Sequence, residues 1–240
     1  MPEAFIIDAV RTAGARKGGR LSGWHPADLA ASVLDALVAR TGIDPAAIDD
    51  VVMGCVGQAG EQSNNIARNA VLASRLPESV PATSIDRQCG SSQQALHFAA
   101  QAVMAGSMDV VIAAGVESMT RVPMGLPATL PFKHGFGSYM SPAMQARYPN
   151  VQFSQFAGAE MLAVKYELTK DELDDYALRS HQRASEATRG AYFGAEILPL
   201  PVRTTEGAET HQTHATDEGI RFDATREGIG AVKLLQEGGR

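Results

Sequence analysis

The stretch that most constrains the fold of this chain is Thr83–Gly106, together with the apolar run that follows it. It begins as a short extended segment and continues as an amphipathic helix that Gly106 ends. The face of this helix consists of apolar residues at the i, i+3, i+4, i+7 and i+8 positions: Ala95, Phe98, Ala99, Ala102 and Val103. Asp109–Gly115 is apolar at nearly every position, as in a strand covered on both faces. The pattern predicts strand, tight junction, helix and strand, with Cys89 at the junction.

Cys89 is a candidate nucleophile because of this position. A thiol in the first turn of a helix lies beside unpaired backbone N–H groups and the positive end of the helix dipole, and both favour the thiolate. Gly90, Ser91 and Ser92 are small, so a substrate can approach the sulfur closely. The alternative is a buried structural cysteine, which is a common environment for a reduced thiol. Cys55, the other cysteine, has no helix start beside it and is expected in the core.

Three segments resemble, in the same order, motifs of the thiolase family, in particular the degradative acetyl-CoA acyltransferases and acetyl-CoA acetyltransferases. Asp86–Ala95 (DRQCGSSQQA) resembles the motif that carries the nucleophilic cysteine of that family. Ala114–Met119 (AGVESM) resembles a second motif, and Ile6–Thr12 (IIDAVRT) resembles the first strand. The likeness runs through nearly the whole chain. It implies a thiolase of the degradative lipid or steroid type with Cys89 as its nucleophile.

The resemblance also implies a reaction. Cys89 takes an acyl group as a thioester, either when CoA cleaves a 3-oxoacyl-CoA or in the reverse condensation. The backbone N–H of Cys89 is the oxyanion donor expected at a helix start. The family's base is a histidine in a Gly-His-Pro motif, and its second acid–base group is a cysteine in a glycine-rich run. Neither motif occurs in this sequence. None of the six histidines is expected to replace that base: His25, His97, His134, His181, His211 and His214.

Coenzyme A or an acyl-CoA is expected as a substrate, with no tightly bound cofactor. Its phosphates require local positive charge, because the formal net charge of the chain is −6. Asp217–Arg221 (DEGIR) resembles the family segment whose arginine approaches the nucleotide, so Arg221 is the first candidate contact. Ser154 and Gln155 stand where many relatives place a His-Met pair that contacts pantetheine, and they are further candidates.

Composition excludes several other classes of protein. The acidic balance, with a sequence pI of about 5.5, disfavours a nucleic-acid-binding surface. No apolar run is long enough to span a bilayer. Two cysteines without a CxxC pattern disfavour a disulfide scaffold or a cysteine zinc site, and two histidines in one polar loop do not make a metal site. These features predict a cytoplasmic protein.

Strands alternate with helices in the first half of the chain, which indicates an α/β fold with a parallel sheet. Phe5–Val10 is predicted to be a central strand, and Val51–Val56 a second one. Pro26–Arg40 is predicted to be a helix with proline at its first position, and a further helix through Leu72 begins at an asparagine cap. The resemblance implies a layered α–β–α thiolase-like core of two similar halves, of which this chain supplies the first.

The resemblance further implies three regions. Residues 1–120 form the N-terminal core half, and residues 121–226 form an inserted, mostly helical loop domain that covers coenzyme A. Residues 227–240 are a return segment toward a second core half, in the same or a second chain.

Within the predicted loop domain, Arg121–Asn150 has no sustained period and is expected to be irregular. Two helices follow, the first at Phe156–Tyr166 and the second beginning at the capping box of Thr169. Glu196–Val202 contains two prolines and is expected to be an edge strand, whereas Thr204–Arg226 is expected to be a polar loop.

Two alternatives remain open from the sequence. A condensing enzyme of the ketoacyl-synthase type shares the thiolase fold and nucleophile, and a non-catalytic fragment or assembly subunit of a thiolase would explain the missing base motifs. The resemblance also implies a homo-oligomer, either a dimer or a tetramer. The 240 residues alone are expected to be inactive. The acyl chain and the direction of flux are not predicted.

Overall fold

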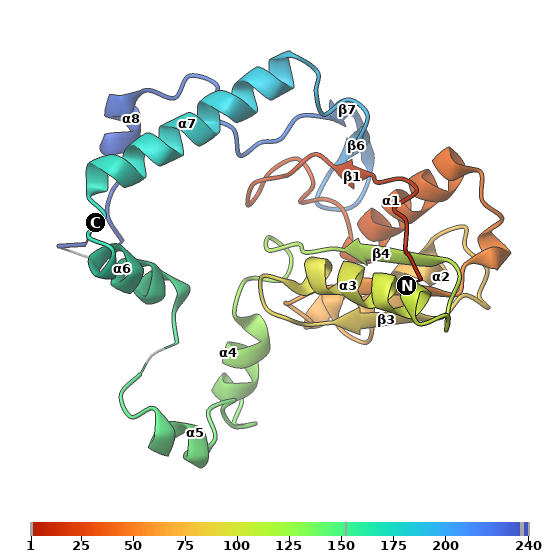
Figure 1. Ribbon diagram of the computed structural model, residues 1–240, viewed down its shortest axis with the longest axis horizontal. Helices are drawn as coiled ribbons and strands as arrows, with labels where there is room; N and C mark the ends of the chain where they lie inside the picture. The colour runs from red at the N-terminus through yellow and green to blue at the C-terminus, as the bar shows by residue number, and fades with distance from the viewer. Residues whose placement is uncertain (1, 152, 236–237, 240) are drawn as a thin grey trace. The chain divides into compact units, whose positions relative to one another are not determined.

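The computed structural model describes residues 2–151, 153–235 and 238–239 (Figure 1). The chain forms two compact units. The first comprises Met1–Gly137 and Ala195–Glu218, and the second comprises Ser138–Gly194 and Gly219–Arg240. The first unit has the α/β architecture that the sequence predicts, and the second unit contains helices.

A parallel sheet lies at the centre of the first unit, with strand order β3–β2–β4. Its strands are β3 (Ala82–Ile85), β2 (Asp50–Gly54) and β4 (Val111–Gly115). Gly54 pairs with Gly115 at the carboxyl ends of β2 and β4. The predicted strands on either side of the Cys89 junction are therefore confirmed, and both end at the same edge of the sheet.

Helices cover the two faces of this sheet. On one face, alternate β2 residues such as Val51 and Met53 pack with α1 (Pro26–Thr41) and α2 (Ile66–Ala73) in the main hydrophobic core. On the other face, α3 (Ser91–Met104) packs against β2 and β4. In Figure 1, α3 lies in front of the sheet and α2 behind it. The unit is a layered α–β–α core.

The ends of these helices follow the predicted signals. Proline stands at the first position of α1, and Gly42 ends that helix in the left-handed conformation. The cap of α2 is Asn65, whose side chain accepts a hydrogen bond from the Arg68 N–H. Gly106, with φ +69°, follows the end of α3 as expected. Two short 3-10 helices also occur in this unit: η1 (Pro45–Ala47) and η2 (Gly60–Gln62).

The prediction of a central strand at Phe5–Val10 is wrong. The segment forms no ladder, and Phe5, Ile6 and Ile7 are 74–82% exposed. A cavity of about 700 Å³ is lined by residues of both this segment and β4, so their backbones are not paired. Only β1 (Arg11–Thr12) pairs, in parallel with β5 (Ile197–Leu198). Apolar, β-rich composition does not make a strand without a neighbour at hydrogen-bonding distance.

A β-hairpin joins β6 (Leu200–Arg203) and β7 (Glu209–His214). The edge strand predicted at 196–202 is therefore confirmed in type, but the prediction of a continuous loop from Thr204 is wrong. The sequence of β7 is Glu-Thr-His-Gln-Thr-His, in which apolar and polar residues do not alternate. Five of its six residues are exposed. β7 is identified as a strand by its pairing with β6, and that pairing cannot be read from the sequence.

Short and long helices follow the sheet. The expected irregular stretch contains two short helices, α4 (Leu126–Lys133) in the first unit and α5 (Pro142–Arg147) in the second. The second unit then has α6 (Gln155–Lys165), α7 (Lys170–Arg189) and α8 (Arg226–Gly230). Both predicted helices are confirmed, as is the capping box between Thr169 and Glu172.

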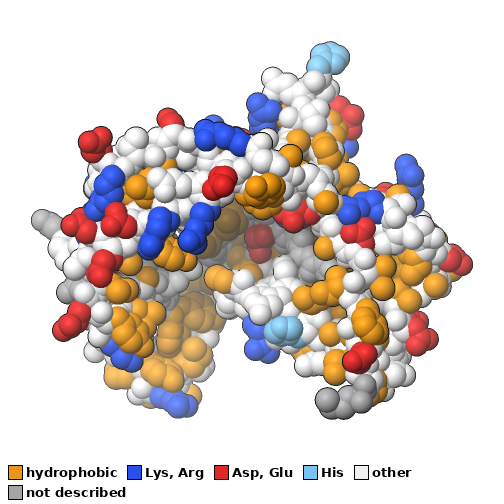
Figure 2. All heavy atoms as spheres, turned by 45° about the horizontal axis from the view of Figure 1, so that its top comes forward, with side chains coloured by type: hydrophobic (Ala, Val, Ile, Leu, Met, Phe, Trp, Pro, Cys, Tyr) orange, Lys and Arg blue, Asp and Glu red, His pale blue; other side chains and the backbone are white. Residues whose placement is uncertain are grey.

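Hydrophobic side chains are exposed on several of these helices. Figure 2 shows hydrophobic side chains, in orange, interspersed with charged ones on the visible face. On α6 they include Phe156, Met161 and Leu162, each more than half exposed. Among the described residues, no helix combines the length and apolar character that crossing a membrane requires.

Candidate functional site

Cys89 lies in a tight turn between β3 and α3. The strand ends at Ile85, Gly90 is the N-cap residue of the helix, and the first helical residue is Ser91. Cys89 is exposed, whereas Cys55 is buried beneath the sheet. Cys89 therefore immediately precedes the N-cap of α3, close to the predicted helix start but outside the first turn in which the sequence analysis expected it.

Local hydrogen bonds fix this turn. The Asp86 carboxylate accepts the Gln88 N–H at 2.7 Å, as in an Asx turn. The Ser91 hydroxyl donates to the Gln88 carbonyl at 2.8 Å and accepts the Arg87 N–H at 3.1 Å. Gln88 has φ +39°, in the region that L-residues rarely adopt. Such backbone outliers cluster at functional sites, and this one immediately precedes Cys89.

Two glycines let the start of α3 approach the sheet. A Cβ atom at Gly54 would lie 2.3 Å from the backbone carbon of Ser91, and one at Gly115 would lie 1.8 Å from the Ser92 hydroxyl. Real Cβ atoms do not approach other atoms this closely, so any side chain at these positions would push α3 and the Cys89 turn away. The sequence analysis missed this role, although Gly54 lies within the strand predicted at Val51–Val56 and Gly115 ends the one predicted at Asp109–Gly115.

Glu117 ties together the loops that follow β2 and β4. Its carboxylate accepts the Val56 N–H at 2.8 Å, the Gly57 N–H at 3.2 Å and the Gln62 side-chain amide at 2.8 Å. The buried Gln62 side chain in turn accepts the Ser118 N–H at 2.6 Å. The AGVESM motif therefore has a structural explanation, because its glutamate organises the edge of the sheet at which the Cys89 turn lies.

The two thiols have different environments. Burial raises the pKa of the Cys55 thiol to about 12, and the nearby Glu117 carboxylate acts in the same direction. Cys55 is therefore protonated and unreactive at neutral pH, as expected for a core residue. Cys89 is the exposed thiol of the pair and stands at a helix start. The structure thus supports the choice of Cys89 over Cys55.

Arg221 lies on the surface of the second unit. Its backbone N–H donates to His181 Nδ1 of α7 at 3.2 Å. Among the described residues, no hydrogen bond or ion pair of its guanidinium group is seen. Just upstream, in the first unit, Arg11 pairs with Asp217 at 2.8 Å and lowers the pKa of that carboxylate. This pair anchors the chain before it passes into the second unit.

Ser154 and Gln155 lie at the start of α6. Ser154 is the N-cap residue and its hydroxyl accepts the Ala157 N–H at 3.4 Å, while Gln155 is the first helical residue. Together with Arg221 they belong to the second unit, and Cys89 belongs to the first. The structure therefore describes the surroundings of each candidate residue within its own unit.

The histidines have roles other than catalysis in this structure. His25 caps α1 by accepting the Ala27 N–H at 3.2 Å, and His97 is exposed on α3. His214 was expected in a polar loop, but it ends β7, is 1% exposed and contacts the Ala13 carbonyl at 3.0 Å. Within the described ranges, no three histidine, cysteine or acidic residues are grouped closely enough to hold a metal ion.

Comparisons with known proteins agree on one family. Residues 4–238 match the family described as "Thiolase, N-terminal domain". The chain is 45% identical over 242 residues to a steroid 3-ketoacyl-CoA thiolase of Mycobacterium tuberculosis, covering 100% of this chain and 58% of that protein. It is 39% identical to a beta-ketoadipyl-CoA thiolase of Escherichia coli, covering 97% of this chain and 60% of that protein.

A solved structure shows the same fold. The acetyl-CoA acetyltransferase of Bacillus anthracis matches 100% of this chain with a TM-score of 0.83 and 32% identity, and the match covers 60% of that enzyme. The chain thus spans 58–60% of the length of these relatives. With its α–β–α core and a cysteine at the start of α3, the chain belongs to the thiolase family and matches the N-terminal domain of that family along nearly its whole length.

Proposed function

We propose that this chain is the nucleophile-bearing part of a thiolase, which transfers an acyl group between Cys89 and coenzyme A. The observation that carries the proposal is the exposed Cys89 in its hydrogen-bonded turn at the start of α3. The relatives named as steroid 3-ketoacyl-CoA and beta-ketoadipyl-CoA thiolases support a 3-oxoacyl-CoA as the substrate class.

In the cleavage direction, the Cys89 sulfur attacks the 3-oxo carbon of the substrate. The bond between C2 and C3 then breaks, its electron pair goes to C2, and C2 takes up a proton as acetyl-CoA leaves. The thiol of a second coenzyme A next attacks the Cys89 thioester, which releases the shortened acyl-CoA and regenerates the cysteine. The backbone N–H of Cys89 is the proposed donor to the oxyanion.

The remaining parts of the proposal concern the rest of the enzyme. The Gly-His-Pro histidine and the second cysteine of the family are proposed to come from a second core half, in the same or a separate chain. We call residues 1–240 together with that half the assembled thiolase. The expected division into core half (1–120), loop domain (121–226) and return segment (227–240) belongs to this proposal, as do a cytoplasmic location and a homodimer or homotetramer. Residues 236, 237 and 240 of the return segment lie outside the described residues.

The direct test is to trap the acyl-enzyme. The assembled thiolase is mixed with a 3-oxoacyl-CoA in the absence of free coenzyme A, so that the second half-reaction cannot proceed. We expect one equivalent of acetyl-CoA in a burst, and peptide mass mapping should find the remaining acyl group on the peptide that contains Cys89. An acyl group on the Cys55 peptide, or no burst at all, would contradict the proposal and favour the role of a non-catalytic assembly subunit.

Arg221 is the proposed contact to a phosphate of coenzyme A, with Ser154 and Gln155 as further contacts near pantetheine. The available guanidinium group of Arg221 supports this role. We expect Arg221→Ala to raise KM for coenzyme A about tenfold, as for the loss of one charge-assisted hydrogen bond, with a smaller change in kcat. The effect should shrink as ionic strength rises, because salt screens an exposed contact. An unchanged KM at low salt would remove Arg221 from the site.

A further inference from the structure

The segment that follows Arg221 is attached to α7 at several points, all within the second unit. Beside Arg221, His181 accepts the Arg221 N–H at 3.2 Å. One residue further, Arg189 donates to the Phe222 carbonyl at 3.3 Å, and its guanidinium group lies 5.8 Å from the centre of the Phe222 ring. Each of these is a single contact at an exposed position, and such a contact alone stabilises the position of the segment only weakly.

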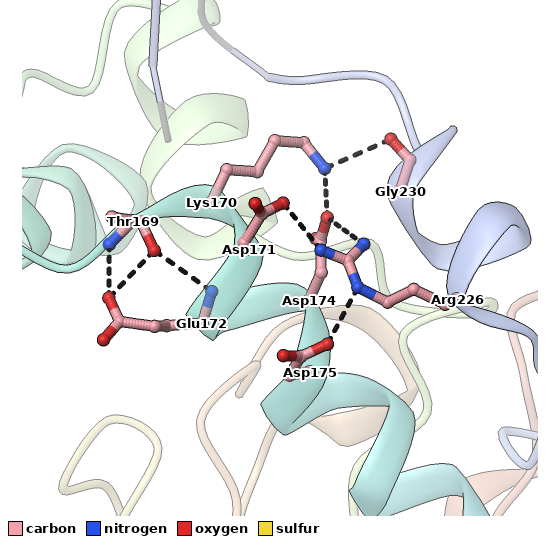
Figure 3. Close-up of polar contacts among 8 residues, drawn as sticks. All are labelled: Thr169, Lys170, Asp171, Glu172, Asp174, Asp175, Arg226 and Gly230. Atoms are coloured by element: carbon pink, nitrogen blue, oxygen red, sulfur yellow. Dashed lines mark hydrogen bonds and ion pairs between the residues drawn. The ribbon is translucent and has the colours of Figure 1, made fainter.

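The strongest attachment is Arg226, at the start of α8. Its guanidinium group contacts three carboxylates on the first two turns of α7, as Figure 3 shows. The contacts are Nη2 to Asp171 Oδ1 at 2.6 Å, Nη1 to Asp174 Oδ2 at 3.2 Å, and Nε to Asp175 Oδ1 at 2.8 Å. We refer to Arg226 and these three aspartates as the ionic clamp.

Lys170 reinforces the clamp from the same end of α7. Its ammonium group pairs with Asp174 of α7 and also donates to the Gly230 carbonyl at 3.1 Å, so it joins α7 to the last residue of α8, whereas Arg226 holds the first (Figure 3). The hydrogen bond from Lys170, together with the charge of Arg226, lowers the pKa of Asp174. The Asp174 side chain is only 14% exposed, which reduces screening by water at the centre of the network. The carboxylate is therefore ionised throughout the neutral pH range.

The clamp matters because of where it lies in the chain. Residues 219–225 separate it from the point at which the chain leaves the first unit. This short segment carries Arg221, and the contacts that join it to α7 are those of Arg221 and Phe222. The clamp fixes the end of the segment to α7, so the segment has fewer conformations, and a ligand that needs one of them binds more tightly.

We propose that Arg226 is a positioning residue, whose ionic clamp on α7 holds Arg221 where it meets the phosphates of coenzyme A. This inference rests on the proposed function, because it assumes that Arg221 contacts the coenzyme. Arginine is required because a planar guanidinium group presents donors to three carboxylates at once, whereas a lysine ammonium is a point charge. Neutralising the carboxylates has a second effect, since unpaired aspartates near the segment would repel a polyanionic ligand.

The first arm of the test does not depend on activity. Hydrogen–deuterium exchange of the 240-residue chain is compared for the wild type, Arg226→Lys and Arg226→Gln. We expect amides in 220–225 to exchange faster in both variants, and most in Arg226→Gln, while amides of α3 are unchanged. Arg75→Gln is the matched control, because Arg75 lies in the first unit, its side chain is 92% exposed, and its guanidinium group has a long 4.0 Å contact with Asp35. The backbone hydrogen bond from the Arg75 N–H to Asp35 is kept in this variant. Unchanged exchange in 220–225 would overturn the proposal.

The second arm uses the assembled thiolase. If the clamp keeps Arg221 in place, its loss should lower the competent population and raise KM for coenzyme A by about three- to tenfold, with kcat changed by less than about twofold. Arg226→Lys should fall between Arg226→Gln and the wild type. Faster exchange with an unchanged KM would overturn the positioning role and leave a purely structural clamp. Should Arg226→Gln fail to fold, Asp175→Asn is used in its place, because it removes one contact of the clamp at a side chain that is 59% exposed. We then expect changes in exchange and in KM in the same directions, but smaller.

The two proposals fail in different ways. If Arg221→Ala leaves KM for coenzyme A unchanged, the assumed contact is wrong, whatever the exchange data show. If Arg221→Ala raises KM but Arg226→Lys and Arg226→Gln do not, the contact stands and the clamp is not its positioning device. Combining Arg226→Gln with Arg221→Ala gives a further check. The effects on KM should not add, because both changes remove the same contact.

Discussion

Replacing Cys89 with alanine is expected to abolish thiolysis in the assembled thiolase, with a loss in kcat on the order of 10⁴-fold or more, as for other covalent nucleophiles. The physical reason is that no acyl-enzyme can form without the sulfur, and no other exposed thiol occurs in this chain to replace it. The measurement is steady-state cleavage of a 3-oxoacyl-CoA, together with a separate titration of coenzyme A binding.

The alanine variant should remain folded and should still bind coenzyme A. Cys89 is exposed, and the Asp86 and Ser91 side chains make hydrogen bonds that fix its turn and that the substitution leaves in place. Cys55→Ala is the opposite control. It removes a buried core thiol and is expected to lower the free energy of unfolding by about 1 kcal/mol while leaving catalysis intact. Activity of the Cys89 variant within tenfold of the wild type would show that the nucleophile lies elsewhere.

The environment of Cys89 was predictable because its signals are local. Small residues follow Cys89, apolar residues recur at helical spacing, and Gly106 ends the helix, so the sequence alone predicts a helix beginning at the cysteine. The same holds for the capping box at Thr169 and the asparagine cap of α2. Each of these features depends on residues within four positions of one another.

Features that depend on distant partners were not predictable in this way. Phe5–Val10 has the composition of a strand, but its pairing requires a neighbouring backbone, and across the cavity it finds none among the described residues. The pairing of β7 with β6 and the ionic clamp of Arg226 are further examples, because nothing in the order of the residues shows which segments meet. Gly54 and Gly115 belonged to predicted strands, but their role follows only from the position of α3.

The position of the coenzyme A contacts was also beyond sequence reasoning. Arg221, Ser154 and Gln155 entered the argument through resemblance to a family segment. The structure accounts for part of their surroundings, since Ser154 caps α6 and the Arg221 N–H bonds to His181. A contact with a ligand is set by side chains from several elements that converge on it, and here Ser154 and Arg221 come from segments of the second unit that lie far apart in the sequence.

Residues 1–240 alone are expected not to turn over 3-oxoacyl-CoA, although Cys89 is in place. Thiolysis needs proton transfer to and from sulfur and to the leaving carbon, and such general acid–base help is worth on the order of 10²–10⁴ in rate. Three of the chain's own histidines already have other contacts in the structure. His25 is engaged as a helix cap, His214 is buried against the Ala13 carbonyl, and His181 accepts the Arg221 N–H.

The other three histidines are no better placed by their elements. His97 stands eight residues along the chain from Cys89, which is about 12 Å along a helix axis at 1.5 Å per residue, too far for a hydrogen bond. His134 ends α4, and His211 is exposed on β7. We expect a slow, single acylation of Cys89 by a reactive thioester in this chain, because that step needs only the sulfur and the start of α3.

The experiment is to express residues 1–240, assay cleavage of a 3-oxoacyl-CoA, and then add the second half as a separate chain. We expect activity only after the two are combined, and we expect it to rise with the concentration of the added half until it saturates. A second half without its Gly-His-Pro histidine is the matched control and should bind without restoring turnover. Full activity of residues 1–240 by themselves would mean that one of the six histidines acts as the base, in which case single substitutions of His97 and His134 would be the first to identify it.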